Sequence, residues 1–416
     1  MKVSIVKKNI NPILPSYLSG QINRISKHTG ILDAIYCTSL IIEINSEILC
    51  FIAYDLLQFD DYLSNRIREA ISLNTHILKS NIFTIPSHTH AGPEVLIDGL
   101  FGIKTESSVA DGYLDFLVDT SLSCVLESLN NQQECTMSYV EVEIDGYYGN
   151  RNNPDKPSDK FIRILQFNQG DTTRAVLVNL ACHPTILGTQ NTRISSDLIG
   201  VMRSELERRY NCSVMMTNGA EGDISNRHYR ISSDEKELER SGKGILEQIP
   251  HKLDFKLCDV SKFNIYQKQF TFTCYKDVSR LEEAIHYNFT LLENSTNQDS
   301  LKLLNATNTV LSHRLQMDIS SIQEIEYSII DMDKIIICCI PMELFSSLYL
   351  ILKERISYPI LLFGLTNTSI GYCVDIESFD NTYEGLTSLF VKGEGERFIE
   401  TLADEIMQIQ RNKTMI

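Results

Sequence analysis

The feature that most constrains the fold of this chain is an alternation of short apolar runs with segments of helical periodicity. Residues 35–44 and 48–57 are rich in β-branched and aromatic side chains, which predicts two strands of a hairpin. Residues 62–73 then carry apolar side chains at helical spacing. The pattern recurs, with strands expected at 81–85, 161–167, 175–181, 213–217, 322–330, 334–340 and 360–365 and helices at 113–129, 196–210, 343–355 and 393–409. It predicts an α/β protein with mixed β-sheets flanked by helices.

The composition predicts a globular protein with a large core. Of its 416 residues, 43% are hydrophobic and 22% are charged, and we expect one catalytic domain over residues 1–416. Residues 232–312 differ, with charged helical stretches and a polar patch at 294–300, and are a candidate surface insertion. The net charge of -16 disfavours nucleic acid as a partner. The apolar runs are far shorter than the roughly 20 residues that span a bilayer, so no transmembrane segment is expected.

Cysteine usage and the amino terminus predict a cytoplasmic protein. The eleven cysteines are an odd number and contain no CxxC pair, which disfavours a disulfide framework. Cys338 and Cys339 are neighbours in an expected strand and should point to opposite faces. The first ten residues lack the continuous apolar stretch and the small-residue cleavage site of a secretory signal.

Residues able to perform catalysis cluster where the expected strands end. His88 and His90 follow the apolar run 81–85, and in an extended backbone both imidazoles would project from one face. Both could then bind one metal ion, or one could bind metal while the other transfers protons. Two surface histidines are the alternative. His183 ends another strand, and its interpretation as a ligand depends on the other segments because a lone histidine is more often structural.

Three further segments carry candidate site residues. Residues 217–226 combine two glycines with an Asx residue, which is typical of a tight turn and would present Ser225 as a nucleophile or leave it as a turn residue. Glu343 lies just beyond an apolar strand, where it is a ligand candidate or a glutamate favoured by a helix dipole. Tyr372 and Tyr383 lie on loop-like sequence, although tyrosine is seldom a metal ligand.

Taken in order, these segments resemble the catalytic domain of the neutral/alkaline ceramidases. The motifs are HTHxGP (88–93), CHPT (182–185), NGxxGDIS (218–225), PxE (341–343) and GY with YEG (371–385), with further similarity at 149–152 and 194–197. The resemblance covers roughly residue 30 to the carboxyl terminus. Long members of the family carry an additional immunoglobulin-like domain and are typically exported. This chain is expected to comprise the catalytic domain without the immunoglobulin-like domain.

The resemblance implies a site with one zinc ion per chain. Its four implied ligands are His88, His183, Glu343 and Tyr372. Four more residues are implied to act on the substrate: Ser225 as nucleophile, His90 as a proton-handling neighbour, and Arg151 and Tyr383 as groups that hold the carbonyl. Zinc lowers the pKa of a bound water or alcohol and polarises an amide carbonyl.

The expected function is that of a zinc-dependent amidohydrolase of lipid or small-molecule metabolism, which cleaves the amide bond of an N-acylated substrate. Asn226 and Arg227 follow Ser225 where the family commonly has proline and asparagine, so a zinc-bound hydroxide stays open as the nucleophile. Glu94 and Val95 replace glycines of the family, which makes ceramide itself a less secure substrate. Two alternatives are acyl transfer or amide-forming cyclisation at the same site, and an inactive binding protein with the same fold.

Overall fold

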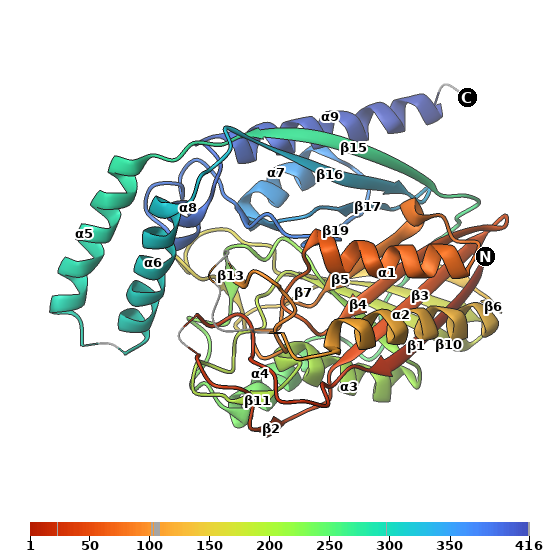
Figure 1. The fold of residues 1–416 in the computed structure, drawn as a ribbon. Coiled ribbons are helices and arrows are strands. Elements are labelled where there is room, and N and C mark those ends of the chain that lie inside the picture. The colour runs from red at the N-terminus through yellow and green to blue at the C-terminus, as the bar shows by residue number, and fades with distance from the viewer. Residues whose placement is uncertain (23, 101–102, 104–108, 297, 415–416) are drawn as a thin grey trace.

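The computed structural model describes the chain except for residues 23, 101–102, 104–108, 297 and 415–416 (Figure 1). A first sheet has the strand order β5-β4-β3-β1-β6. Its strands are β1 (Lys2–Asn9), β3 (Tyr36–Ile44), β4 (Glu47–Tyr54), β5 (Ile82–Pro86) and β6 (Gln133–Glu134). The helices α1 (Asp61–Asn74) and α2 (Tyr113–Asn130) pack on one face of this sheet through a shared apolar cluster. The hairpin of β3 and β4 is the one expected from the sequence.

A second sheet has the order β12-β10-β9-β7-β14. Its strands are β7 (Thr136–Glu143), β9 (Phe161–Gln169), β10 (Thr172–Leu180), β12 (Val214–Asn218) and β14 (Lys256–Cys258). The helix α3 (Asp197–Tyr210) connects the parallel strands β10 and β12, and α4 (Glu235–Glu247) packs beside α3. An apolar cluster joins these two helices to the sheet.

A third sheet has the order β15-β16-β17-β19. Its strands are β15 (Asn264–Thr273), β16 (Ile322–Asp331), β17 (Ile336–Cys339) and β19 (Ile360–Phe363), and it is covered by α7 (Ser346–Arg355) and α9 (Glu394–Thr414). One apolar cluster contains Phe51, Phe167 and Phe363, one from each sheet. Cys339 lies in this shared cluster, whereas Cys338 lies in the cluster under the helices, as the strand period predicts. The three sheets therefore share one core.

Residues 232–312, the candidate surface insertion, contain elements of two kinds. The helix α4 and the strands β14 and β15 belong to the helix layer and to two sheets. By contrast, α5 (Val278–Asn294) and α6 (Gln298–Gln316) form a helical pair that projects at one side of the sheets (Figure 1). The polar patch 294–300 spans the connection between these two helices and the start of α6, and its residue 297 lies outside the described residues.

Short elements complete the described chain. They are η1 (Lys79–Asn81), β2 (Gly30–Ile31), β8 (Gly149–Asn150), β11 (Arg193–Ile194), β13 (Ile224–Ser225), β18 (Glu343–Leu344), β20 (Tyr372–Cys373) and α8 (Tyr383–Thr387). The helix expected at 343–355 begins only at Ser346, because Glu343 and Leu344 pair with β20. Among the described helices, none combines the length and the apolar character needed to cross a bilayer.

The order of the sheets brings several strand ends to one place. The strand pairs β4 and β5, β10 and β12, and β17 and β19 are each parallel, so the members of a pair end at the same edge. Gly364 N–H donates to Asn218 O at 3.1 Å, which ties the end of β19 to the end of β12. Loops that leave carboxyl ends of neighbouring parallel strands are where α/β proteins place their sites.

Candidate metal centre and active site

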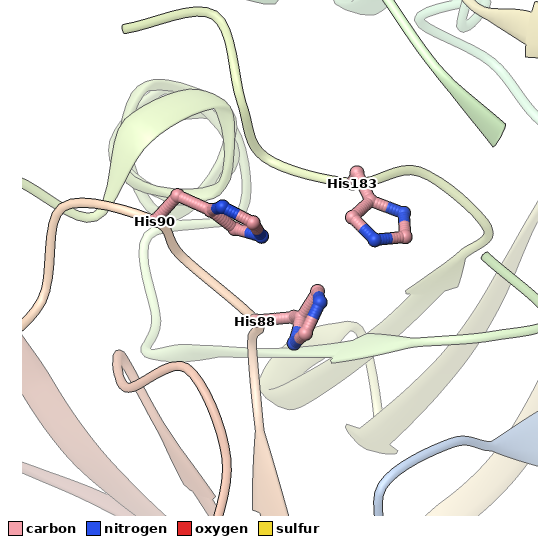
Figure 2. Close-up of side chains that lie close together, drawn as sticks. All are labelled: His88, His90 and His183. Atoms are coloured by element: carbon pink, nitrogen blue, oxygen red, sulfur yellow. The ribbon is translucent and has the colours of Figure 1, made fainter. Parts of the chain in front are cut away.

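His88 lies just beyond β5 and has a left-handed backbone, with φ 68°. The backbone is therefore not extended from residue 88 to 90, and the geometry expected from the strand period is wrong at this point. The two side chains nevertheless meet, since the ring centroids of His88 and His90 are 5.1 Å apart. His183 joins them, with its ring centroid 4.7 Å from that of His88 (Figure 2).

Backbone carbonyl groups fix the tautomers of His88 and His183. Nδ1 of His88 lies 2.8 Å from Leu57 O, and Nδ1 of His183 lies 2.7 Å from Glu221 O. A carbonyl oxygen only accepts a hydrogen bond, so each Nδ1 carries the proton. Burial, followed by Arg151, lowers the pKa of His183 to about 3, which keeps its ring neutral. The Nε2 atom of His183 is therefore a bare lone-pair donor, and the His88 tautomer leaves its Nε2 available in the same way.

Both Nε2 atoms face the same carboxylate oxygen. Glu343 Oε2 lies 3.3 Å from His88 Nε2 and 3.1 Å from His183 Nε2. Lone pairs of two imidazoles and one carboxylate thus converge on a single point, an arrangement that a cation stabilises.

Tyr372 is brought to Glu343 by pairing of β18 with β20, in which the two residues are direct partners of a parallel ladder. The N–H of Glu343 donates to Gly371 O at 3.0 Å. Arg151 Nη2 donates to the Tyr372 hydroxyl at 3.1 Å. Burial raises the pKa of the Tyr372 phenol well above its usual value, and the negative charge of Glu343 is the second cause of this shift. A phenolate at this position would need a neighbouring cation.

Glu221 is a site residue that the sequence analysis did not assign. It is 0% exposed, and both of its carboxylate oxygens lack a hydrogen-bond partner among the described residues. Its ligand atom lies within 4.8 Å of those of His88 and Glu343. Burial and the charge of Glu343 raise its pKa well above the usual range. An acidic residue inside the NGxxGDIS motif was the available signal.

The donor set fits zinc. Two imidazole nitrogens, a carboxylate oxygen and a phenol oxygen are nitrogen and oxygen ligands of the kind that this metal accepts. The second imidazole nitrogen of each histidine is anchored on a backbone carbonyl, as is usual for metal-bound histidine. Two buried carboxylates, Glu221 and Glu343, would also repel each other without a nearby cation.

Ser225 lies next to this cluster on the short strand β13. It pairs with Gly149 of β8 and forms an isolated parallel bridge with His183. The residue is 4% exposed, and its Oγ accepts the backbone N–H of Arg227 at 3.2 Å. The turn expected after β12 therefore places the serine beside the histidines.

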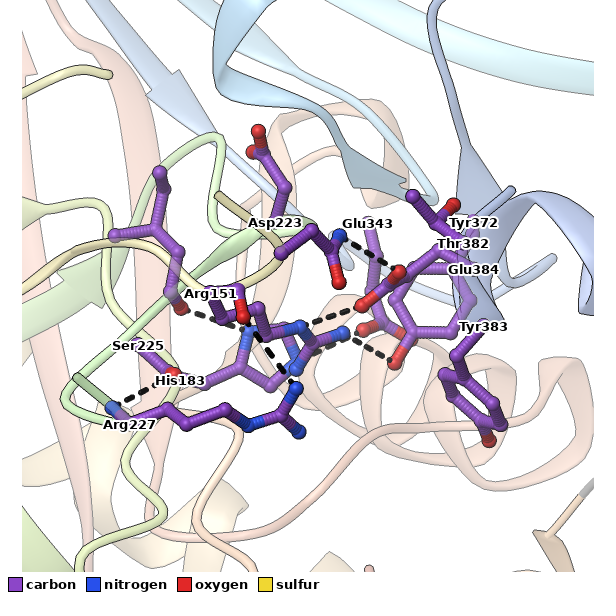
Figure 3. Close-up of polar contacts among 12 residues, drawn as sticks. Arg151, His183, Asp223, Ser225, Arg227, Glu343, Tyr372, Thr382, Tyr383 and Glu384 are labelled. Atoms are coloured by element: carbon purple, nitrogen blue, oxygen red, sulfur yellow. Dashed lines mark hydrogen bonds and ion pairs between the residues drawn. The ribbon is translucent and has the colours of Figure 1, made fainter. Parts of the chain in front are cut away.

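Arg151 is held by a residue that the sequence analysis also left unassigned. Its Nε donates to Glu384 Oε1 at 2.6 Å, and Asn152 Nδ2 donates to Glu384 Oε2 at 2.9 Å (Figure 3). The backbone N–H of Arg151 donates to Asp223 O at 2.7 Å. A buried guanidinium that is paired on one side keeps a fixed direction on the other, toward Tyr372.

His90 and Tyr383 complete the group. Both ring nitrogens of His90 are buried and have no hydrogen-bond partner among the described residues. Burial, followed by His88, lowers the pKa of His90 well below its usual value, so the ring is neutral. Tyr383 begins α8, and its ring centroid lies 6.0 Å from that of Tyr372.

A cavity of about 420 Å³ opens onto this group. Seven of the eight residues assigned from the sequence line it: His88, His90, Arg151, Ser225, Glu343, Tyr372 and Tyr383. The eighth, His183, contacts the lining residue Glu343 through its Nε2 atom. The helix α6 supplies part of another wall through Ser300, Leu303 and Ala306. The structure thus brings together all eight residues, which come from segments far apart in the sequence.

The fold and the site define an α/β protein with a buried cluster of histidines, carboxylates and a tyrosine beside a serine. The family model of neutral/alkaline non-lysosomal ceramidase, N-terminal, matches residues 12–221, half of the chain. The chain therefore belongs to the neutral/alkaline non-lysosomal ceramidase family, as its motifs predict. Ceramidases hydrolyse an amide bond, so membership indicates a hydrolase of this class.

Solved structures with the same fold are ceramidases. The neutral ceramidase from Pseudomonas aeruginosa is 14% identical, with a TM-score of 0.72 over 97% of this chain and 73% of that chain. A ceramidase complexed with C2 is 12% identical, with a TM-score of 0.76 over 99% of this chain and 75% of that chain. No curated protein matches the chain. The shared fold confirms the expected ceramidase-like catalytic architecture.

Proposed function

We propose that the protein is a zinc-dependent amidohydrolase that cleaves the amide bond of an N-acylated small molecule or lipid. The observation that carries this proposal is the convergence of His88 Nε2 and His183 Nε2 on Glu343 Oε2, beside a cavity that Ser225 also lines. Family membership supports the amide bond as the target.

One zinc ion would be held by His88, His183, Glu343 and Tyr372, with the carboxylate of Glu221 close enough to add negative charge. When bound, zinc polarises a carbonyl group and lowers the pKa of an adjacent alcohol or water. The hydrogen bond from Arg151 stabilises the anionic form of Tyr372 that a metal ligand requires.

Residues of the chain carry out the nucleophilic attack, the stabilisation of the oxyanion and the proton transfer. Ser225 Oγ attacks the carbonyl carbon, which forms an acyl ester and breaks the C–N bond. Arg151 and Tyr383 donate hydrogen bonds to the carbonyl oxygen as it gains negative charge. His90, neutral in its buried position, takes the serine proton and passes it to the leaving amine. A water molecule then releases the acid and restores the serine.

Replacement of the serine tests this route. Ser225→Ala should lower kcat by at least about 10³-fold, since removal of a nucleophile commonly costs this much or more. Ser233→Ala, which changes another serine of the cavity wall, is the matched control. Zinc content of both variants is measured alongside. Near full turnover by Ser225→Ala would show that water attacks the carbonyl directly.

Isotope labelling separates hydrolysis from acyl transfer. During turnover in ¹⁸O water, hydrolysis places label in the released acid. Unlabelled acyl product joined to a new amine would instead support transfer or cyclisation at the same site.

We also propose that residues 1–416 act as one catalytic domain and that the protein works in the cytoplasm. Support for one domain comes from the apolar cluster shared by the three sheets. Support for a reducing compartment comes from the eleven cysteines, all of which are free thiols.

A further inference from the structure

Among the described residues that line the cavity, positive side chains outnumber negative ones, although the whole chain has a net charge of -16. Its fully charged lining residues are Arg151, Arg227, Arg230 and Glu343. Glu384 already neutralises Arg151, and Glu343 is a proposed ligand of a dication. The positive charge of this wall is therefore a local departure from the acidic character of the molecule.

Arg227 is the arginine closest in sequence to the proposed nucleophile. Its backbone N–H donates to Ser225 Oγ, so its side chain leaves the main chain beside the reacting group. The guanidinium makes a long hydrogen bond from Nη1 to Arg151 O at 3.4 Å (Figure 3). Among the side chains that the structure describes, no carboxylate forms an ion pair with it. Burial lowers the pKa of Arg227, and the positive charge of Arg151 is the second cause of this shift.

A guanidinium that lines a cavity selects for a particular ligand chemistry. Its planar array of N–H groups matches the oxygens of a carboxylate or phosphate, to which it can donate two parallel hydrogen bonds. A ceramide carries no such group. The other lining residues include Leu57, Leu100 and Leu303, which provide apolar surface for an acyl chain. A volume of about 420 Å³ suits a small molecule.

We propose that the substrate is an N-acyl compound with a carboxylate or phosphate close to the scissile amide, and that Arg227 binds this oxyanion. The inference rests on the proposed amidohydrolase function and names its substrate class. Arg227 is then a specificity residue, which holds the charged end of the substrate while the amide carbonyl lies at Ser225.

Matched substrates test the charge preference. N-Hexanoylglycine and the phosphate ester of N-hexanoylethanolamine carry the oxyanion, whereas N-hexanoylglycinamide is a neutral analogue. The wild-type protein should hydrolyse at least one anionic compound with a kcat/KM about 10-fold or more above that of the neutral amide, mainly through KM. Comparing the two anionic compounds shows whether the group is a carboxylate or a phosphate.

The variants assign the preference to one side chain. Arg227→Gln should bring the anionic-to-neutral ratio of kcat/KM close to one, and Arg227→Lys should restore part of it. Arg174→Gln is the matched control, because Arg174 is an exposed arginine near the start of β10 that bonds to Gln169. It should leave the ratio unchanged. Thermal denaturation of each variant verifies folding.

A binding measurement tests recognition of the oxyanion separately from hydrolysis of the amide. Calorimetric titration of Ser225→Ala with N-hexanoylglycine measures recognition without turnover, and its loss in the double variant with Arg227→Gln supports the inference. Equal kcat/KM for neutral and anionic amides in wild type would overturn the inference and leave the amidohydrolase intact. If no amide is hydrolysed and no anionic compound binds, both proposals are overturned.

Discussion

Two backbone carbonyl groups decide the chemistry of the central histidines. The Leu57 and Glu221 carbonyls each accept the Nδ1 proton of a histidine and leave Nε2 for a metal. Neither carbonyl can be found from a motif, because the sequence identifies side chains and the carbonyls belong to the loops after β4 and β12. The same holds for Glu384, whose contact with Arg151 joins residues 233 positions apart.

Removing the charge of Glu221 should weaken metal binding. In Glu221→Gln a neutral carboxamide replaces a buried carboxylate close to His88 and Glu343, so zinc affinity should fall by about 10- to 100-fold. Competition with a coloured chelator measures this affinity. Glu247→Gln, at an exposed position of α4, is the control. Equal zinc affinity in wild type and Glu221→Gln would show that Glu221 does not act on the metal.

At the scale of elements, the site depends on a close approach between two loops. Gly222 N–H donates to Leu344 O at 2.9 Å, and a Cβ at residue 222 would lie 2.7 Å from Glu343 O. Backbone atoms cannot move aside as a flexible side chain does. The glycine therefore lets the turn after β12 reach the segment that carries Glu343.

Gly222→Ala should disturb both stability and the metal centre. The added methyl group would force the two loops apart, at a cost of about 1–3 kcal/mol in the free energy of unfolding. Zinc should then raise the melting temperature less than it does in wild type. Gly30→Ala is the control, since the nearest atom to its Cβ would be Arg193 Cγ at 3.9 Å. Wild-type stability and zinc response in Gly222→Ala would contradict a required close approach.

The elements with strong apolar periodicity were predictable, and the strands with half-exposed polar sequence were not. Residues 62–73 correspond to α1, and 35–44 to β3, because burial of one face imposes the pattern. The strand β15, with the sequence NIYQKQFTFT, lies at the edge of its sheet and has mostly exposed or half-buried residues. Its sequence shows little apolar alternation, and it lies within residues 232–312, which were expected to contain helical stretches and a surface insertion.

The close approach of three candidate site residues was predictable for a related reason. His88, His183 and Glu343 each follow a buried strand, and parallel strands bring such ends together. The left-handed conformation of His88 could not be anticipated, since it depends on the hydrogen bond of its N–H to Leu56 O across the sheet.

For the molecule as a whole, buried acids shape stability as a function of pH. Asp197 accepts the backbone N–H groups of Ile186, Leu187 and Leu198. Burial nevertheless raises its pKa from 3.8 to about 6. Between pH 3.8 and about pH 6 the folded protein binds more protons than the unfolded chain. Asp197 therefore contributes its full stabilisation below pH 3.8. This stabilisation is lost as the pH rises through about 6, the pKa of Asp197 in the folded state.

Asp197→Asn isolates this contribution. Asparagine is always neutral and tolerates the left-handed backbone of residue 197, where φ is 53°. The free energy of unfolding of wild type minus that of the variant should fall by about 2 kcal/mol from about pH 4 to about pH 7. Chemical denaturation at both pH values measures the difference, and other titrating groups cancel. A difference that does not vary with pH would contradict the raised pKa.

The central claim is that segments distant in the sequence form one zinc site. The most direct test is the metal content of the purified protein, measured by plasma mass spectrometry before and after zinc loading, with His183→Ala measured beside it. We predict about one zinc per chain in wild type and little in the variant, because His183 supplies one of the two converging Nε2 atoms. A folded wild-type protein that takes up no zinc would contradict the account.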